Sequence, residues 1–80
     1  MLFSELGHKE IVNLSNGERL GLLIDSDIRI DESTGKIIAF LMPERRIQIK
    51  FFGENNHIEI PWESIRKIGQ DMIIVELENY

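Results

Sequence analysis

The fold is decided by the stretch His57–Gly69, which reads HIEIPWESIRKIG. Its first residues alternate and place Ile58, Ile60 and Trp62 on one face, as in a half-buried β-strand. Pro61 ends the regular pairing, because proline has no N–H to donate to a ladder. A second short apolar segment follows. The stretch therefore predicts a strand, a proline corner and another strand, with Trp62 filling one end of a barrel.

Length and composition set the limits around this corner. The chain has 80 residues, 42% of them hydrophobic and 29% charged, with a net charge of -5. This balance is typical of a folded domain, and the length favours one domain over residues 1–80 with a thin core. The acidic charge disfavours nonspecific binding to nucleic acid or to anionic membranes.

The sequence contains no cysteine, which excludes disulfides, thiolate metal sites and a cysteine nucleophile. The N-terminal residues do not read as a signal peptide. The longest apolar run, residues 37–43, is too short for membrane insertion, since a membrane helix needs about 20 residues. We expect a cytoplasmic protein.

Residues 19–31 alternate between apolar and polar side chains, which predicts a strand with one buried face. Such a strand would span roughly 43 Å, whereas a domain of this size is about 30 Å across. We therefore expect it to bend, at Gly21 or Ser26. The inward positions are expected to be Leu20, Leu22, Ile24, Ile28 and Ile30.

Turn signals separate the strands. Asn16-Gly17 predicts a tight hairpin, because Asn-Gly tolerates positive φ at both positions. Residues 31–36 predict a second hairpin with Gly35 in a left-handed position, and residues 69–71 a last turn. Ile37–Met42 reads as a strand covered on both faces, residues 47–51 as an alternating strand, and residues 53–56 as a turn.

Single helical turns are expected at residues 4–6 and 62–64, and Glu63 and Arg66 are close enough in sequence to pair. Short strands joined by short turns predict an all-β fold. We expect a small antiparallel barrel of about six strands with one or two short helical turns.

A signature near the start of the chain comprises Leu6-Gly7, Ile11, Gly17, Leu20-Gly21 and Asp25. It resembles the opening of the PRC-barrel domain family, and the resemblance extends along nearly the whole chain. Further segments resemble the stand-alone YlmC/YmxH-type sporulation proteins of endospore-forming bacteria: residues 17–21, 25–27, 30–32, 52–53 and 60–69. The resemblance implies a PRC-type barrel that serves as a non-enzymatic adaptor or assembly module.

A basic and aromatic hairpin is the first candidate contact surface. Arg45, Arg46 and Lys50 lie close to Phe52, which is expected to face outward. An exposed aromatic side chain beside basic residues is typical of a protein interface. The same composition also suits single-stranded nucleic acid, so an RNA- or ribosome-associated role, like that of the barrel domain in the ribosome-maturation factor, stays an alternative.

Acidic residues form a second candidate surface. Asp25 and Asp27 are expected on a solvated face, and a divalent-metal or small-ligand role is a further alternative. An EF-hand is excluded, because Ile30 and Lys36 occupy the positions that its glycine and glutamate require. The only histidines, His8 and His57, are expected at the surface.

No serine lies in a nucleophile elbow and no glycine pattern forms a phosphate loop, so we expect no catalytic residues, metal or cofactor. The function expected is a non-enzymatic interaction or assembly module that binds a protein partner through a barrel face or strand edge. Self-association is also a possible outcome for a barrel this small, because it would cover an exposed strand edge and add stability.

Overall fold

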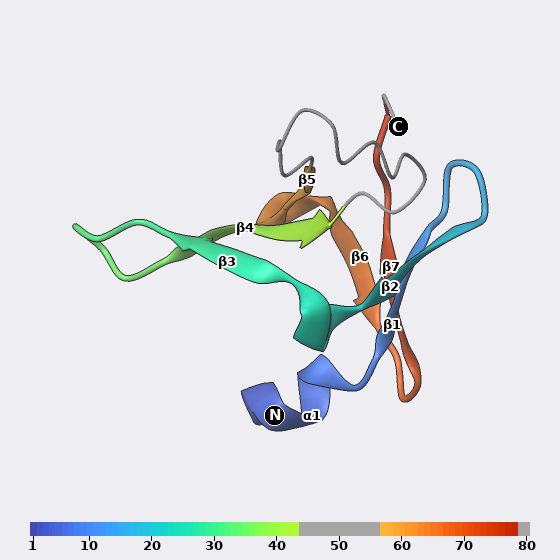
Figure 1. Cartoon of the computed structure of the whole chain (residues 1–80), viewed down its shortest axis with the longest axis horizontal. Coiled ribbons are helices and arrows are strands. Elements are labelled where there is room, and N and C mark those ends of the chain that lie inside the picture. The colour runs from blue at the N-terminus through green and yellow to red at the C-terminus, as the bar shows by residue number, and fades with distance from the viewer. Residues whose placement is uncertain (44–56, 79–80) are drawn as a thin grey trace, which may run out of the picture.

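The computed structural model describes residues 1–43 and 57–78, which form two small β-sheets around one core (Figure 1). The predicted all-β class is confirmed. In chain order the elements are α1 (Phe3–Gly7), β1 (Glu10–Asn13), β2 (Glu18–Leu22), the 3₁₀ turn η1 (Leu23–Asp25), β3 (Asp27–Ile30), β4 (Ile37–Pro43), β5 (His57–Pro61), the 3₁₀ turn η3 (Trp62–Ser64), β6 (Ile65–Ile68) and β7 (Met72–Val75).

The larger sheet has four strands in the order β2-β1-β7-β6, and the smaller has three in the order β3-β4-β5. Neighbouring strands are antiparallel except β1 and β7, which run parallel. The expectation of a purely antiparallel barrel is wrong at this pair. Two antiparallel hairpins, β1–β2 and β6–β7, join side by side there, and local sequence patterns carry no information on such a distant pairing.

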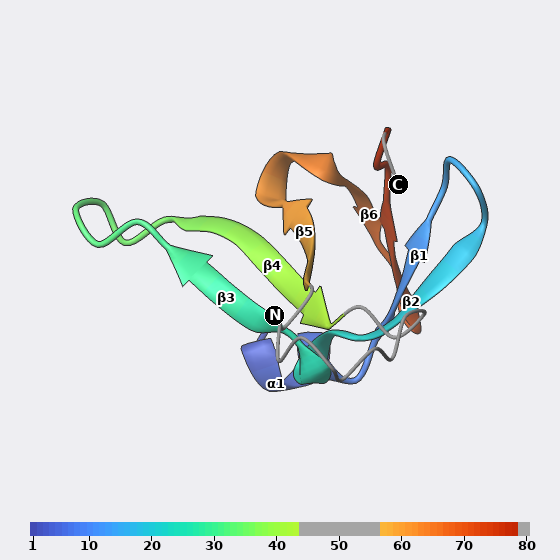
Figure 2. The same ribbon diagram turned by 45° about the horizontal axis from the view of Figure 1, so that its top comes forward.

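The two sheets are connected at both edges by short turns. Strand β2 continues through η1 into β3, and β5 continues through η3 into β6 (Figure 2). Each edge strand of one sheet therefore runs on into an edge strand of the other, which is how a barrel turns its corners. Within residues 1–43 and 57–78 no ladder joins the two sheets, so hydrogen bonding does not close the barrel.

Large apolar side chains from both sheets fill the core. The largest fully buried ones are Phe40, Ile11, Leu23, Met42, Ile60, Ile73 and Val75. The alternation predicted for β5 is confirmed, because Ile58 and Ile60 are buried whereas His57 and Glu59 are exposed. Each such buried side chain contributes about 1.5–3 kcal/mol through apolar burial.

The predicted long strand is interrupted by η1, which lies between the two expected bend positions. The hydroxyl of Ser26 donates to the carbonyl oxygen of Leu23 at 2.6 Å and closes this turn. The turn changes which residues point inward, so Leu23 is buried whereas Ile24 is 58% exposed. The prediction of an inward face is confirmed at Leu20 and is wrong at Leu22, Ile24 and Ile30, which are exposed.

Strand β4 is buried less completely than its apolar sequence predicts. Ala39, Phe40 and Met42 are buried, but Ile38 is exposed. Ile30 pairs with Ile37 while Arg29 pairs with Ala39, so Ile38 is the extra residue of a β-bulge. A bulge leaves its extra residue outside the regular pairing, which explains the departure from the expected burial on both faces.

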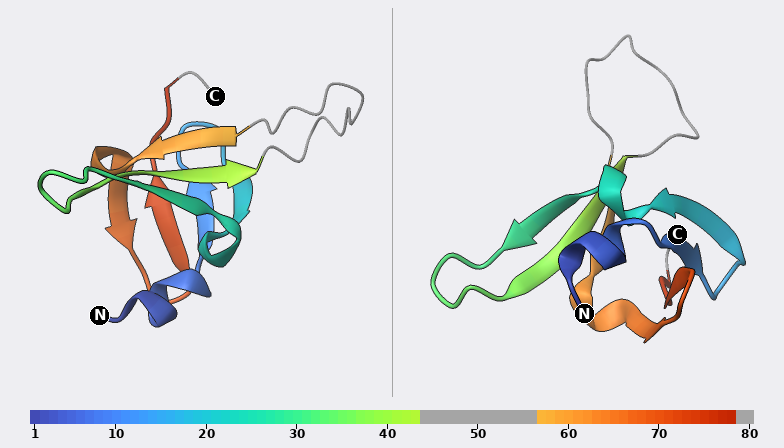
Figure 3. Two further views of the ribbon diagram at one scale, coloured as in Figure 1. Left: turned by 60° about the vertical axis from the view of Figure 1, so that its left-hand side comes forward. Right: turned by 90° about the horizontal axis from the view of Figure 1, so that it is seen from below.

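Both predicted hairpins are present. The β1–β2 connection has Gly17 at φ 71°, and the Gly17 N–H donates to the carbonyl oxygen of Asn13 at 2.7 Å. Among the described residues only glycines have positive φ, so Asn16 does not adopt the left-handed conformation expected of it. Gly35, at φ 78°, closes the β3–β4 hairpin, which projects from the body of the molecule (Figures 1 and 3).

Two buried polar side chains tie the ends of the chain together. The ammonium group of Lys9 donates to the carbonyl oxygens of Gly69 and Gln70, at 2.7 and 2.6 Å, and anchors the β6–β7 turn. The side-chain oxygen of Asn13 accepts hydrogen bonds from the N–H groups of Ser15 and Leu77, at 3.2 and 3.0 Å. These contacts fix β1 against the C-terminal segment.

The short helix α1 lies at one end of the barrel, beside η1 (Figure 3). Leu6 and Gly7 are its buried residues, and the position of a Cβ on Gly7 lies 3.4 Å from Cβ of Ile24. The helical turns predicted at residues 4–6 and 62–64 are both confirmed. No helix in the described ranges is long and apolar enough to cross a membrane.

Candidate protein-docking site

The first predicted contact surface lies outside the described residues. Arg45, Arg46, Lys50 and Phe52 all fall within residues 44–56, as do the strand predicted at 47–51 and the turn predicted at 53–56. The role of this basic and aromatic hairpin stays a prediction.

The acidic pair is exposed, as expected, but is divided between two elements. Asp25 ends η1 and Asp27 begins β3. The Oδ1 atom of Asp27 accepts the N–H of Ile28 at 2.9 Å, so this carboxylate is engaged with its own strand. Among residues 1–43 and 57–78, no group of three or more histidine, cysteine, aspartate or glutamate residues is placed to hold a metal ion. His8 and His57 are exposed, as predicted.

Trp62 does not fill the barrel end, and this prediction is wrong. The side chain is 41% exposed, and its ring packs at a tilt of 47° against Phe40, with 5.8 Å between ring centroids. Pro61 ends β5, and η3 begins at Trp62, so the alternation of the strand does not continue to this residue. One side of the indole therefore contacts the core while the remainder faces solvent.

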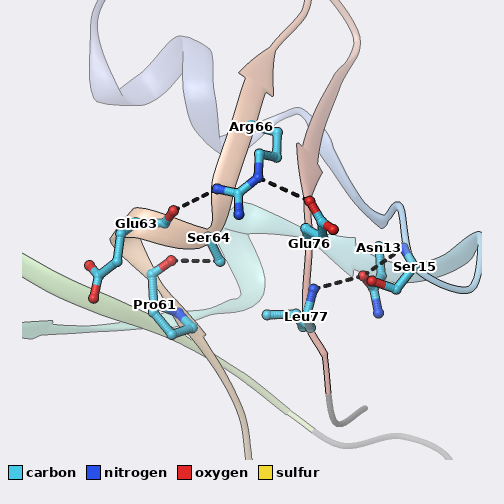
Figure 4. A network of polar contacts seen from close by, with 8 residues as sticks. All are labelled: Asn13, Ser15, Pro61, Glu63, Ser64, Arg66, Glu76 and Leu77. Carbon is cyan, nitrogen blue, oxygen red and sulfur yellow. Dashed lines mark hydrogen bonds and ion pairs between the residues drawn. The ribbon is translucent and has the colours of Figure 1, made fainter.

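The turn that carries Trp62 is fixed by a set of hydrogen bonds (Figure 4). The Ser64 hydroxyl donates to the carbonyl oxygen of Pro61 at 2.7 Å, and the Ser64 carbonyl accepts the N–H of Glu76 at 2.9 Å. Arg66 donates through Nη1 to the carbonyl oxygen of Glu63 at 2.9 Å and through Nε to Oε1 of Glu76 at 3.1 Å. Arg66 thus contacts the backbone of Glu63, and the ion pair predicted between these residues forms instead with Glu76.

Three residues with exposed apolar side chains lie on neighbouring parts of the fold, in β3, β4 and η3. Ile30, Ile38 and Trp62 are 52%, 41% and 41% exposed, and we call these three residues the apolar row. Ile30 pairs with Ile37, the neighbour of Ile38, and Ala39 on the other side of Ile38 pairs with Pro61. The row therefore crosses the smaller sheet from β3 through β4 to η3, and η3 contacts β4.

Such an arrangement is suited to binding a protein. Exposed isoleucine and tryptophan side chains that lie together mark interaction surfaces more often than isolated ones do. Tryptophan is enriched at positions that dominate binding energy. Because Phe40 and the hydrogen bonds of η3 already hold Trp62 in place, little side-chain entropy would be lost on binding.

Sequence reasoning missed Ile30 and Ile38 because period-2 patterning assigned both to buried strands. Ile38 is exposed by the bulge, which depends on pairing between strands, and Ile30 ends β3 beside the projecting hairpin. A signal was present for Trp62, because proline favours the start of a helical turn. The turn that begins after Pro61 ends the strand alternation that would have pointed the indole inward.

The chain belongs to the PRC-barrel domain family, which it matches over residues 1–78. The resemblance to this family is confirmed.

Within this family, the chain is similar to small proteins of Bacillus and Clostridium species. The chain is 44% identical to the uncharacterized protein YmxH of Bacillus subtilis (strain 168), over 96% of this chain and 89% of YmxH. It is 43% identical to the probable sporulation protein YlmC of the same organism, over 92% of this chain and 89% of YlmC. A Clostridium acetobutylicum protein, the uncharacterized protein CA_C1697, is 36% identical over 88% of this chain and 77% of its own length.

Proposed function

We propose that this chain is a non-enzymatic interaction module of sporulating cells, which binds a protein partner in the cytoplasm through the apolar row. The observation that carries the proposal is the exposure of Ile30 and Ile38 on the smaller sheet and of Trp62 in the η3 turn that follows it. The sporulation context comes from the similarity to the probable sporulation protein YlmC of Bacillus subtilis.

Two features of the edge strands support binding through a barrel face and not through a strand edge. The outer edge strand β3 begins with Asp27, whose carboxylate already accepts the N–H of Ile28. The edge strand β6 contains a bulge at Arg66, between the pairs that Ile65 and Lys67 make with β7. Both devices weaken an edge as a template for an added strand.

The non-enzymatic part of the proposal rests on the chemistry of the described surface. The apolar row contains no titratable or nucleophilic side chain, so its residues offer packing area and no proton transfer. Turnover of a defined substrate, lost on substitution of a single residue, would contradict this part.

A pair of matched variants tests the docking face. Ile38→Asp places a charge in the apolar row, whereas Leu14→Asp places the same charge at an aliphatic residue that is 60% exposed on the β1–β2 turn. Affinity-tagged full chains are recovered from sporulating cells after circular dichroism has shown that both are folded. We expect a specific co-purifying protein with the unmodified chain and with Leu14→Asp, and its loss with Ile38→Asp. Equal recovery with both variants would contradict the proposal.

A further inference from the structure

We infer that the partner of the apolar row is a protein segment whose apolar residues are flanked by basic ones. This inference rests on the proposed function and adds the chemistry of the partner. It follows from the charges at the two ends of the row.

Carboxylates flank the row at both ends. Glu63 follows Trp62 and is exposed, and at the other end Asp31 and Glu32 follow Ile30. The Oδ1 atom of Asp31 accepts the N–H of Ser33 at 2.9 Å, which holds its charge at the base of the hairpin loop. The row thus lies between acidic groups.

Among residues 1–43 and 57–78, the two arginines nearest the row in sequence are paired with other groups. Arg29 lies 3.8 Å from a carboxylate oxygen of Glu59, and Arg66 is bound to Glu76 and to the Glu63 carbonyl. Lys36 is an exposed basic residue on the same hairpin, and it opposes only part of the acidic charge. The net charge of the whole chain, -5, has the same sign as the surroundings of the row.

The acidic surroundings of the apolar row favour one kind of binding partner over two others. A basic partner segment would meet opposite charge at both ends of the row, which speeds encounter and fixes orientation. A second copy of the chain in a twofold dimer would bring the same acidic surface against itself, and a nucleic acid would bring phosphates against it. Both arrangements would be repulsive.

Trp62 is the only tryptophan of the chain, so its fluorescence reports directly on the row. The full chain is titrated with three synthetic peptides of about 14 residues, roughly four helical turns. One carries lysine and leucine in amphipathic order, the second has glutamate in place of lysine, and the third has serine in place of leucine. Each titration is made at about 0.15 M salt, where the screening length is about 8 Å.

We expect a blue shift of Trp62 emission with the lysine and leucine peptide alone, and a weaker affinity at higher salt. Glu63→Lys and Glu32→Lys should each weaken binding about tenfold, or about 1.4 kcal/mol. Glu78→Lys makes the same charge change near the C-terminus and should leave the affinity unchanged.

Several results would overturn the inference. If the glutamate peptide binds equally and Ile38→Asp abolishes both complexes, the charge preference is wrong while docking on the row stands. If no peptide shifts the emission, or if Glu78→Lys weakens binding as much as Glu63→Lys, the inference also fails. Light scattering that shows a dimer lost in Ile38→Asp would identify a second copy as the occupant instead.

Discussion

The ring of Trp62 rests against the ring of Phe40, with centroids 5.8 Å apart, yet Phe40 is buried while Trp62 is 41% exposed. Two large aromatic side chains in contact therefore have different roles. Phe40 belongs to the core, and Trp62 is held at the surface by contact with it.

This difference predicts unequal stability effects. Phe40→Ala should cost about 3–5 kcal/mol, as for other buried aromatic truncations. Trp62→Ala should cost only about 1–2 kcal/mol, because the indole keeps much of its water contact and the ring pair contributes about 0.5–1.5 kcal/mol. Urea unfolding followed by circular dichroism measures both values. Equal losses of stability in the two variants would indicate that Trp62 is buried as fully as Phe40.

Asn13 is predicted to be the most sensitive polar residue of the described fold. Asn13→Ala removes the acceptor of two backbone N–H groups, including the buried contact to Leu77. Leaving the buried Leu77 donor unsatisfied costs about 1–3 kcal/mol, so we expect a loss of about 2 kcal/mol.

The matched control is Asn16→Ala, because the hydrogen bond that the Asn16 side chain accepts from the N–H of Glu18, at 2.9 Å, is exposed. Its loss should stay below about 1 kcal/mol. Hydrogen exchange at the Leu77 amide should accelerate in Asn13→Ala and not in Asn16→Ala. An unchanged exchange rate would show that Asn13 does not hold the C-terminal segment.

Alanine substitutions at Gly21 and Gly35 distinguish the cost of backbone strain from the cost of steric crowding. Both glycines have positive φ, at 117° and 78°, but a Cβ on Gly21 would lie 3.1 Å from Cε of Met42, whereas nothing lies within 4 Å at Gly35. Gly35→Ala should therefore cost about 1–2 kcal/mol through backbone strain alone. Gly21→Ala should cost more, up to about 3 kcal/mol. Thermal unfolding compares the two variants, and a reversed order would contradict the close approach of Met42 to Gly21.

Arg66 is predicted to act on Trp62 through the η3 turn. Arg66→Ala removes the contacts to the Glu63 carbonyl and to Glu76. The stability loss should be small, about 1 kcal/mol or less, because the ion pair is exposed. The mobility of the indole should nevertheless increase, which fluorescence anisotropy detects. Lys67→Ala, an exposed neighbour on β6, should change neither quantity.

Much of this fold could be predicted from residue patterns because its signals are local. The alternation of β5, the proline corner and the glycines of the hairpins each depend on neighbouring residues. The parallel pairing of β1 with β7, the bulge at Ile38 and the anchoring of the β6–β7 turn by Lys9 depend on distant residues. The exposure of the apolar row was not predicted for similar reasons, because a bulge in strand pairing exposes Ile38, and Ile30 lies where β3 enters the projecting hairpin.

The apolar row is proposed to be the surface that meets a protein partner. A photo-reactive amino acid placed singly at Ile38 or at Leu14 in the full chain tests this in sporulating cells, because both side chains are exposed and aliphatic. Irradiation followed by mass spectrometry should yield a defined protein adduct from Ile38 and none from Leu14. The same adduct from both positions, or an adduct from Leu14 alone, would contradict the claim.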